Sequence, residues 1–71
     1  MSDKKLNRIK EVLRFQGRTN KWLAEQLGKN QVTVSRWCNN TQQPDLETLY
    51  KIATLLQVKV YDLLVEAYPP E

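Results

Sequence analysis

Five side chains between positions 31 and 36 are of the types that read the edges of DNA bases: Gln31, Val32, Thr33, Ser35 and Arg36. A glutamine amide can pair bidentately with adenine, an arginine with guanine, and a valine can cover a thymine methyl group. Serine and threonine hydroxyls suit either base edges or phosphates. The chemistry that this cluster offers is recognition, provided that one helix presents it.

The sequence around this cluster predicts two short helices, over 19–27 and 31–38, joined by a tight turn. Gly28 ends the first helix because glycine enters the left-handed conformation without steric cost. Asn30 offers a side-chain oxygen as the N-cap of the second. Each helix has an apolar inner face, made of Leu23, Ala24 and Leu27 in the first and of Val34 and Trp37 in the second. This pattern is typical of a helix-turn-helix.

Three further helices are predicted, over about 3–15, 45–57 and 60–67, and no strand is convincing. Gly17 ends the first of these, and Asp45 caps the next one after Pro44. The side chains expected to point inward are Leu6, Ile9, Val12 and Leu13 in the first, Leu46, Leu49, Ile52, Ala53 and Leu56 in the next, and Leu63 and Leu64 in the last. We therefore expect residues 1–71 to form one all-α domain, a compact five-helix bundle.

Composition limits the classes of protein that this chain can belong to. The 71 residues include one cysteine and no histidine, so neither a disulfide framework nor a zinc set is available, and no metal or cofactor is expected. The net charge is +3, and the basic residues gather in the first half, where the helix-turn-helix lies. We expect a protein that is not an enzyme, because paired carboxylates, a phosphate-binding glycine loop and an activated nucleophile are all missing. A lone thiol without a signal-like or membrane-spanning segment predicts a cytoplasmic location.

An ordered series of blocks along the chain resembles the phage-repressor, Cro-type (lambda-repressor-like) helix-turn-helix family. The blocks are LAEQLG at 23–28, TVSRW at 33–37, PDLETL at 44–49 and the pair Ile52-Ala53. The resemblance implies a five-helix bundle whose third helix enters the major groove of double-stranded DNA. It implies base contacts from Gln31, Val32 and Arg36, with Thr33 and Ser35 close to base edges or phosphates. It also implies phosphate contacts from Thr19, Asn20, Asn39, Asn40 and Thr41.

Two departures from the family's pattern carry structural predictions. Cys38 stands where the family usually has an acidic residue, and Leu13 stands where it often has arginine. Because a small apolar contact can replace a buried ion pair, we predict that Leu13 and Cys38 lie close together. Asn40 stands where glycine is common, and asparagine is the next-best residue for a positive φ angle.

Several side chains have two interpretations. We expect Trp37 in the core rather than stacked on a base, and Cys38 as a buried structural thiol rather than a redox sensor. Trp22 is expected to be half-exposed surface packing rather than a partner contact. Lys4, Lys5 and Lys10 form either a solvated helix face or a set of phosphate contacts.

The function that these patterns favour is a sequence-specific, DNA-binding transcriptional regulator, which we expect to act as a repressor. A homodimer on a roughly palindromic operator is expected, since one recognition helix reads only about four or five base pairs. One alternative is an antitoxin or a phage or plasmid control protein that acts with a protein partner. Another is a protein-interaction module that has lost DNA binding, for which Trp22, Tyr61, Leu64 and Tyr68 would supply the apolar face.

Overall fold

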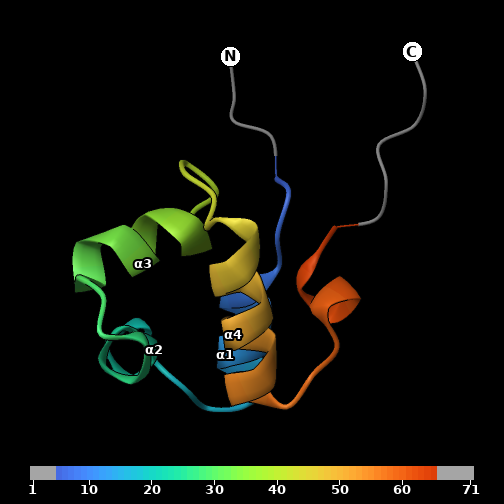
Figure 1. The fold of residues 1–71 in the computed structure, drawn as a ribbon, viewed down its shortest axis with the longest axis horizontal. Coiled ribbons are helices and arrows are strands. Elements are labelled where there is room, and N and C mark those ends of the chain that lie inside the picture. Colours follow the sequence, from blue (N-terminus) through green and yellow to red (C-terminus); the bar gives the residue numbers. More distant parts are fainter. Residues whose placement is uncertain (1–4, 66–71) are drawn as a thin grey trace.

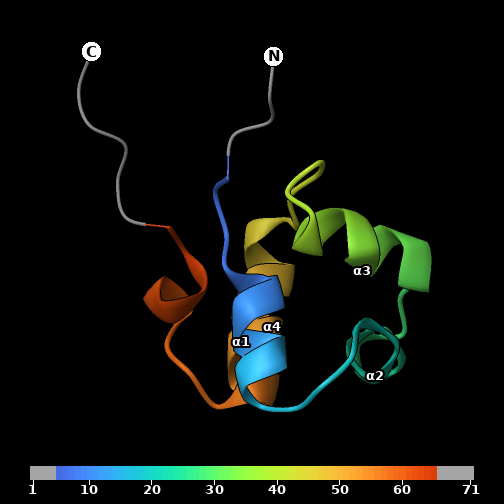
Figure 2. The same cartoon turned by 180° about the vertical axis from the view of Figure 1, so that it is seen from behind.

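The computed structural model describes residues 5–65 as a helical domain. Its elements are α1 (Ile9–Phe15), α2 (Asn20–Leu27), α3 (Gln31–Cys38), α4 (Leu46–Leu56) and a 3-10 helix, η1 (Val60–Leu63). In Figure 1, α3 lies to the left of the upper end of α4, with α1 behind α4 and α2 seen end-on below α3. The reverse view in Figure 2 shows that α2 and η1 lie on opposite sides of the α1 and α4 pair.

A single hydrophobic core joins all five helices. The buried apolar side chains are Ile9, Leu13, Leu23, Ala24, Val34, Trp37, Cys38, Leu49, Ile52, Ala53, Leu56 and Leu63. Trp37 is only 5% exposed, so its predicted place in the core is confirmed. The central helices follow the predicted apolar period except at Leu46, which was expected to point inward but is 68% exposed at the first position of α4. Burial of the other apolar side chains is the main stabilising contribution to a domain of this size. Within residues 5–65, each helix is too short or too polar to cross a lipid bilayer.

Side-chain caps set the start of the three central helices where the sequence predicts them. Thr19 Oγ1 accepts from the N–H of Trp22 at 3.0 Å and begins α2. Asn30 Oδ1 accepts from the N–H of Val32 at 2.7 Å and begins α3. Asp45 accepts from the N–H of Thr48 at 3.1 Å and begins α4. Hydrogen bonding with the Thr48 side chain, and then with its N–H, holds the pKa of the Asp45 carboxyl below its ordinary value. Gly28 ends α2 with φ +66°, in the left-handed region.

The first helix is shorter than predicted. The expectation of a helix over 3–15 is wrong at its start, because α1 begins at Ile9, and residues 1–4 lie outside the described part. Residues 6–8 instead pair with residues 63–65: the Arg8 N–H donates to Leu63 O at 2.7 Å, and the Val65 N–H donates to Leu6 O at 3.0 Å. Leu6, predicted to point inward, is 41% exposed. Pairing with a distant segment satisfies these backbone groups without a helix.

The last helix is also shorter and of a different kind. The expectation of an α-helix over 60–67 is wrong, because η1 is a 3-10 helix that ends at Leu63, and Leu64 is already extended. An antiparallel bridge joins Leu64 to Asn7, so a minimal β contact is present where no strand was expected. The end of the predicted helix, 66–67, and Tyr68 lie outside the described residues. The domain therefore contains four α-helices and one 3-10 helix within its described part, rather than five α-helices.

Candidate nucleic-acid interface

The two faces of α3 differ sharply in exposure. Val34, Trp37 and Cys38 are buried against the core, as the spacing predicts. Gln31, Val32 and Arg36 are exposed, and Val32 is 57% exposed despite its apolar side chain. The remaining two candidates for base contact, Thr33 and Ser35, are half-buried at the edge of this face. The structure thus divides the five candidates into three that point outward and two at the border with the core.

Asn20, the first residue of α2, fastens that helix to α3. Its Nδ2 donates to Ser35 Oγ at 3.2 Å, and its Oδ1 accepts from Cys38 Sγ at 3.2 Å. The nitrogen and the oxygen of the Asn20 side-chain amide, predicted to contact a phosphate, therefore both have partners inside the protein. The signal in the sequence is the i, i+3 spacing of Ser35 and Cys38, which places the two partners on one face of α3.

Cys38 is a protonated, buried thiol. Burial raises its pKa to about 11; Lys10 acts against this shift, and Glu11 adds to it. The thiol therefore keeps its proton near neutral pH and has one to donate to Asn20. Leu13 and Cys38 are both buried and line one hollow at the contact between α1 and α3, so the structure brings this predicted pair together.

That hollow has a volume of about 220 Å³ and lies between α1, the start of α2 and the end of α3. Its lining is Lys10, Leu13, Arg14, Arg18, Asn20, Cys38 and Asn39. Asn20 and Asn39, which the resemblance assigns to separate contacts with DNA, therefore lie in one hollow. The guanidinium carbon of Arg18 lies 4.3 Å from the centre of the Trp22 ring.

The turn after α3 uses most of its polar groups internally. The N–H groups of Asn39, Asn40 and Thr41 donate to carbonyls of Ser35, Trp37 and Arg36, respectively. Asn40 has φ +61°, as predicted for a position where glycine is common.

The side chain of Asn40 holds the start of the described chain. Its Oδ1 accepts from the N–H groups of Leu6 and Asn7 at 2.8 and 2.9 Å. The Thr41 hydroxyl donates to Arg36 O at 3.2 Å. Asn39, which is exposed, offers the least engaged side chain of this turn.

Exposed positive charge surrounds α3 on the side of α1 and α2. Within the described part of the chain, the ion pairs are Lys5 with Glu11 and Lys51 with Glu47, and both are exposed. Of the other cations of the first half, Arg8 donates to Leu64 O beside η1, away from α3. The rest have no acidic partner within the described residues; they are Lys10, Arg14, Arg18, Lys21, Lys29 and Arg36. An excess of unpaired cations on one side favours a polyanionic ligand.

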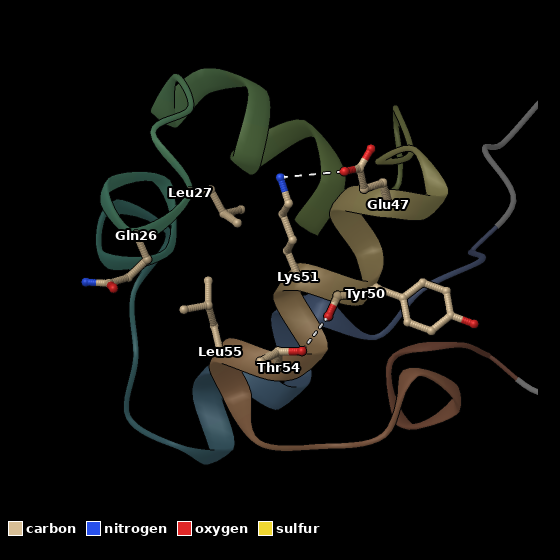
Figure 3. A pocket seen from close by; sticks show the side chains of 7 residues that line it. All are labelled: Gln26, Leu27, Glu47, Tyr50, Lys51, Thr54 and Leu55. Carbon is tan, nitrogen blue, oxygen red and sulfur yellow. Dashed lines mark hydrogen bonds and ion pairs between the residues drawn. The ribbon is translucent and has the colours of Figure 1, made fainter.

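A larger hollow, of about 480 Å³, lies between α2 and α4. Figure 3 shows Leu27 and Leu55 facing each other across it, whereas Tyr50 points away. Its polar groups are engaged locally: the Thr54 hydroxyl donates to Tyr50 O at 3.1 Å, and Lys51 lies 4.0 Å from Glu47. The remaining lining residue is Gln26. We interpret this hollow as a shallow gap in helix packing.

The apolar face that would suit a protein partner is divided. Trp22 lies on α2, half-buried against the core, as expected. Tyr61 and Leu64, exposed by 65% and 37%, lie at η1, on the other side of the molecule (Figure 1). Tyr68 is outside the described residues.

Comparisons with known proteins agree with this geometry. The helix-turn-helix family, of the Cro/C1 type, matches residues 9–63. A crystal structure of a putative DNA-binding protein from Bacteroides fragilis is 55% identical, with a TM-score of 0.83; the match covers 84% of this chain and 97% of that one. None of the curated proteins matches.

Proposed function

Since the chain belongs to the Cro/C1-type helix-turn-helix family, we propose that it is a sequence-specific, DNA-binding transcriptional regulator that reads the major groove with α3. One observation carries this proposal: α3 buries Val34 and Trp37 and leaves Gln31, Val32 and Arg36 on its outer face. The similar protein from Bacteroides fragilis, described as DNA-binding, supports it.

The dimensions and chemistry of α3 suit a groove. An α-helix with its side chains is about 10–12 Å in diameter, and the major groove of B-DNA is about 12 Å wide, so the groove admits α3. Arg36 is the candidate for a bidentate bond to guanine, and Gln31 for one to adenine. Val32 is the candidate for contact with a thymine methyl group. Thr33 and Ser35, at the border of this face, are placed for bases at the groove wall or for phosphates.

Phosphate contacts position such a helix without reading sequence. The N-terminus of α2 is one candidate, because the first N–H groups of a helix lack partners within it and attract anions; Thr19 and Asn20 lie there. The turn after α3 is the other. In this turn, Asn39 and Thr41 are the candidates for direct contact, and Asn40 contributes by fixing the shape of the backbone.

A homodimer that represses by occupying a palindromic operator is the mechanism that we favour. Two copies of α3 spaced by one helical turn of DNA would roughly double the number of base pairs read and multiply discrimination. Repression needs no further chemistry, because a bound domain blocks access to the DNA beneath it. A cytoplasmic location follows from the same proposal.

The test is a selection of bound sequences from a random duplex library, followed by affinity measurements on the winner across salt concentrations. An enriched palindrome with a steep salt slope supports a dimeric, specific regulator. An enriched single site supports a specific regulator and overturns the dimer. No enrichment, with weak binding at low salt only, overturns the proposal and favours a protein partner, for which a pull-down is the next experiment.

A further inference from the structure

We propose that the hollow between α1, the start of α2 and the end of α3 binds one phosphodiester group of the DNA backbone, with Lys10, Arg14 and Arg18 as its cationic walls. This inference rests on the proposed function and adds residues outside the helix-turn-helix to the interface. We refer to the site as the α1 hollow; it has a volume of about 220 Å³.

Three separate segments bring positive charge to the α1 hollow. Lys10 and Arg14 are four residues apart on α1, so they lie on the same face of that helix. Arg18 comes from the turn between α1 and α2, and Asn20 marks the positive end of the α2 dipole. None of the residues that line the hollow is acidic.

The charge is concentrated rather than neutralised by neighbours. An adjoining hollow shares Lys10, Cys38 and Asn39 and adds Lys5, Glu11 and Asn40. Its one acidic residue, Glu11, is paired with Lys5, and that pairing lowers the pKa of the Glu11 carboxyl. The ion pair of Glu11 is thus with Lys5, in the adjoining hollow, and Lys10 and Arg14 form no ion pair with an acidic residue within residues 5–65.

Arg18 is held for binding by an aromatic ring. Its guanidinium group lies 4.3 Å from the centre of the Trp22 ring, a distance at which cation and ring attract each other. Stacking leaves the N–H groups at the edge of the guanidinium plane free to bond a phosphate oxygen. A guanidinium that is already ordered loses less conformational entropy on binding.

The position of the hollow identifies the phosphodiester as its ligand. Cys38 and Asn39, at the C-terminal end of α3, form one of its walls, so it adjoins the end of the helix that we place in the groove. The sugar-phosphate backbone of a DNA strand that borders the major groove would pass that end of α3. Among its outward residues, α3 itself carries only one cation, Arg36, and the α1 hollow supplies the charge that the groove wall requires.

The experiment compares two double variants with the same net charge. The first, Lys10→Gln with Arg14→Gln, alters the α1 hollow; the control, Lys51→Gln with Lys59→Gln, alters α4 and the residue before η1. Each removes two positive charges and changes the net charge from +3 to +1. Affinity is measured for the selected duplex and for a scrambled one over a range of salt concentrations, with thermal unfolding to verify the fold.

We expect the hollow variant to bind both duplexes roughly tenfold more weakly, with the ratio between them unchanged. Since each hollow is proposed to bind one phosphate, and each neutralised phosphate contributes about 0.9, the slope of log K against log salt should become shallower by about 0.9 for each bound copy of the protein. The control should keep the wild-type slope. If the double variant does not fold, the single variants Lys10→Gln and Arg14→Gln should each weaken binding to both duplexes and make the slope shallower by up to about 0.9 for each bound copy.

Two results overturn the inference and leave the proposed function standing. One is an unchanged salt slope in the hollow variants. The other is an equal reduction of affinity and slope in the control, which would mean that net charge alone matters. The proposed function fails separately, when the wild-type protein does not distinguish the selected duplex from the scrambled one.

Discussion

Asn40 and the main chain of Asn7 exchange two hydrogen bonds across 33 residues of sequence. The Asn7 N–H donates to Asn40 Oδ1 at 2.9 Å, and Asn40 Nδ2 donates to Asn7 O at 3.2 Å. The side chain of Asn7, 2% exposed, donates in turn to Trp37 O at 3.0 Å and to Gln43 Oε1 at 2.7 Å. The segment before α1 is thereby fixed to the turn that follows α3.

Replacing Asn40 should separate its backbone role from its hydrogen bonds. Asn40→Gly keeps the positive φ angle but leaves the N–H groups of Leu6 and Asn7 without this acceptor, so we expect a loss of about 1–3 kcal/mol in the free energy of unfolding. Asn40→Ala should lose about 1 kcal/mol more, because alanine is strained in the left-handed region. Urea denaturation measures both.

Asn39→Ala is the matched control for this pair. Asn39 is exposed and has an ordinary φ of −88°, so its replacement should change the free energy of unfolding by less than about 0.5 kcal/mol. An Asn40→Gly protein as stable as the wild type would show that the exchange of hydrogen bonds with Asn7 contributes nothing to stability.

The raised pKa of Cys38 predicts a stability that falls at alkaline pH. The unfolded thiol loses its proton near its ordinary pKa of 9.0, whereas the folded thiol keeps it up to about 11. Between these values the unfolded state binds fewer protons, so the free energy of unfolding decreases as pH rises. The decrease from this group is at most about 2–3 kcal/mol.

The measurement is urea unfolding at pH 7.5 and at pH 10.5, for the wild type and for Cys38→Ala. Effects of pH that do not involve Cys38 are common to both proteins, so only the difference between the two declines reports on this thiol. We expect the wild type to lose more stability than the variant over this interval. Equal declines would mean that the thiol is not held in its protonated form by the fold.

The sequence predicted the central helices well because their signals are local. Thr19, Asn30 and Asp45 each lie within three residues of the N–H that they cap, and Gly28 ends α2 by its own conformation. The two ends of the domain were mispredicted because their structure depends on distant partners. The main chains of Leu6 and Arg8 form hydrogen bonds with those of Val65 and Leu63, respectively. The spacing of apolar residues along a helix does not predict such long-range pairing.

The candidate site was predictable to a similar extent. The outward face of α3 follows from the spacing of Val34 and Trp37, which fixes the buried side. The use of the Asn20 amide depends on how closely α2 and α3 pack, and a sequence pattern does not encode that distance. The α1 hollow depends likewise on the contact between α1 and α3, so Lys10 and Arg14 resembled any solvated helix face.

Asn20→Ala should lower both stability and DNA affinity. The substitution removes the bonds from Asn20 to Ser35 and Cys38, for which we expect a loss of about 1–3 kcal/mol in the free energy of unfolding. Affinity should fall for all DNA sequences alike, because Asn20 lies at a proposed phosphate contact and its bonds to Ser35 and Cys38 hold α3 in place. Lys21→Ala, an exposed neighbour on α2, should leave stability unchanged. A loss of affinity without a loss of stability would assign Asn20 to DNA contact alone.

Arg36→Ala should change sequence preference rather than overall affinity for DNA. Arg36 is the exposed cation of α3, and losing a bidentate contact with guanine should cost about 1–3 kcal/mol at one or two base pairs of the operator. Arg14→Ala is the contrasting variant, because the loss of a phosphate contact weakens binding to all sequences and reduces the salt slope by about 1.

Repeating the selection with each variant distinguishes the two effects. The enriched sequence should lose its base preference at one or two positions with Arg36→Ala and stay unchanged with Arg14→Ala. An Arg36→Ala protein with wild-type affinity and wild-type preference would show that α3 does not read bases with this residue, and that the outer face of α3 docks in another way.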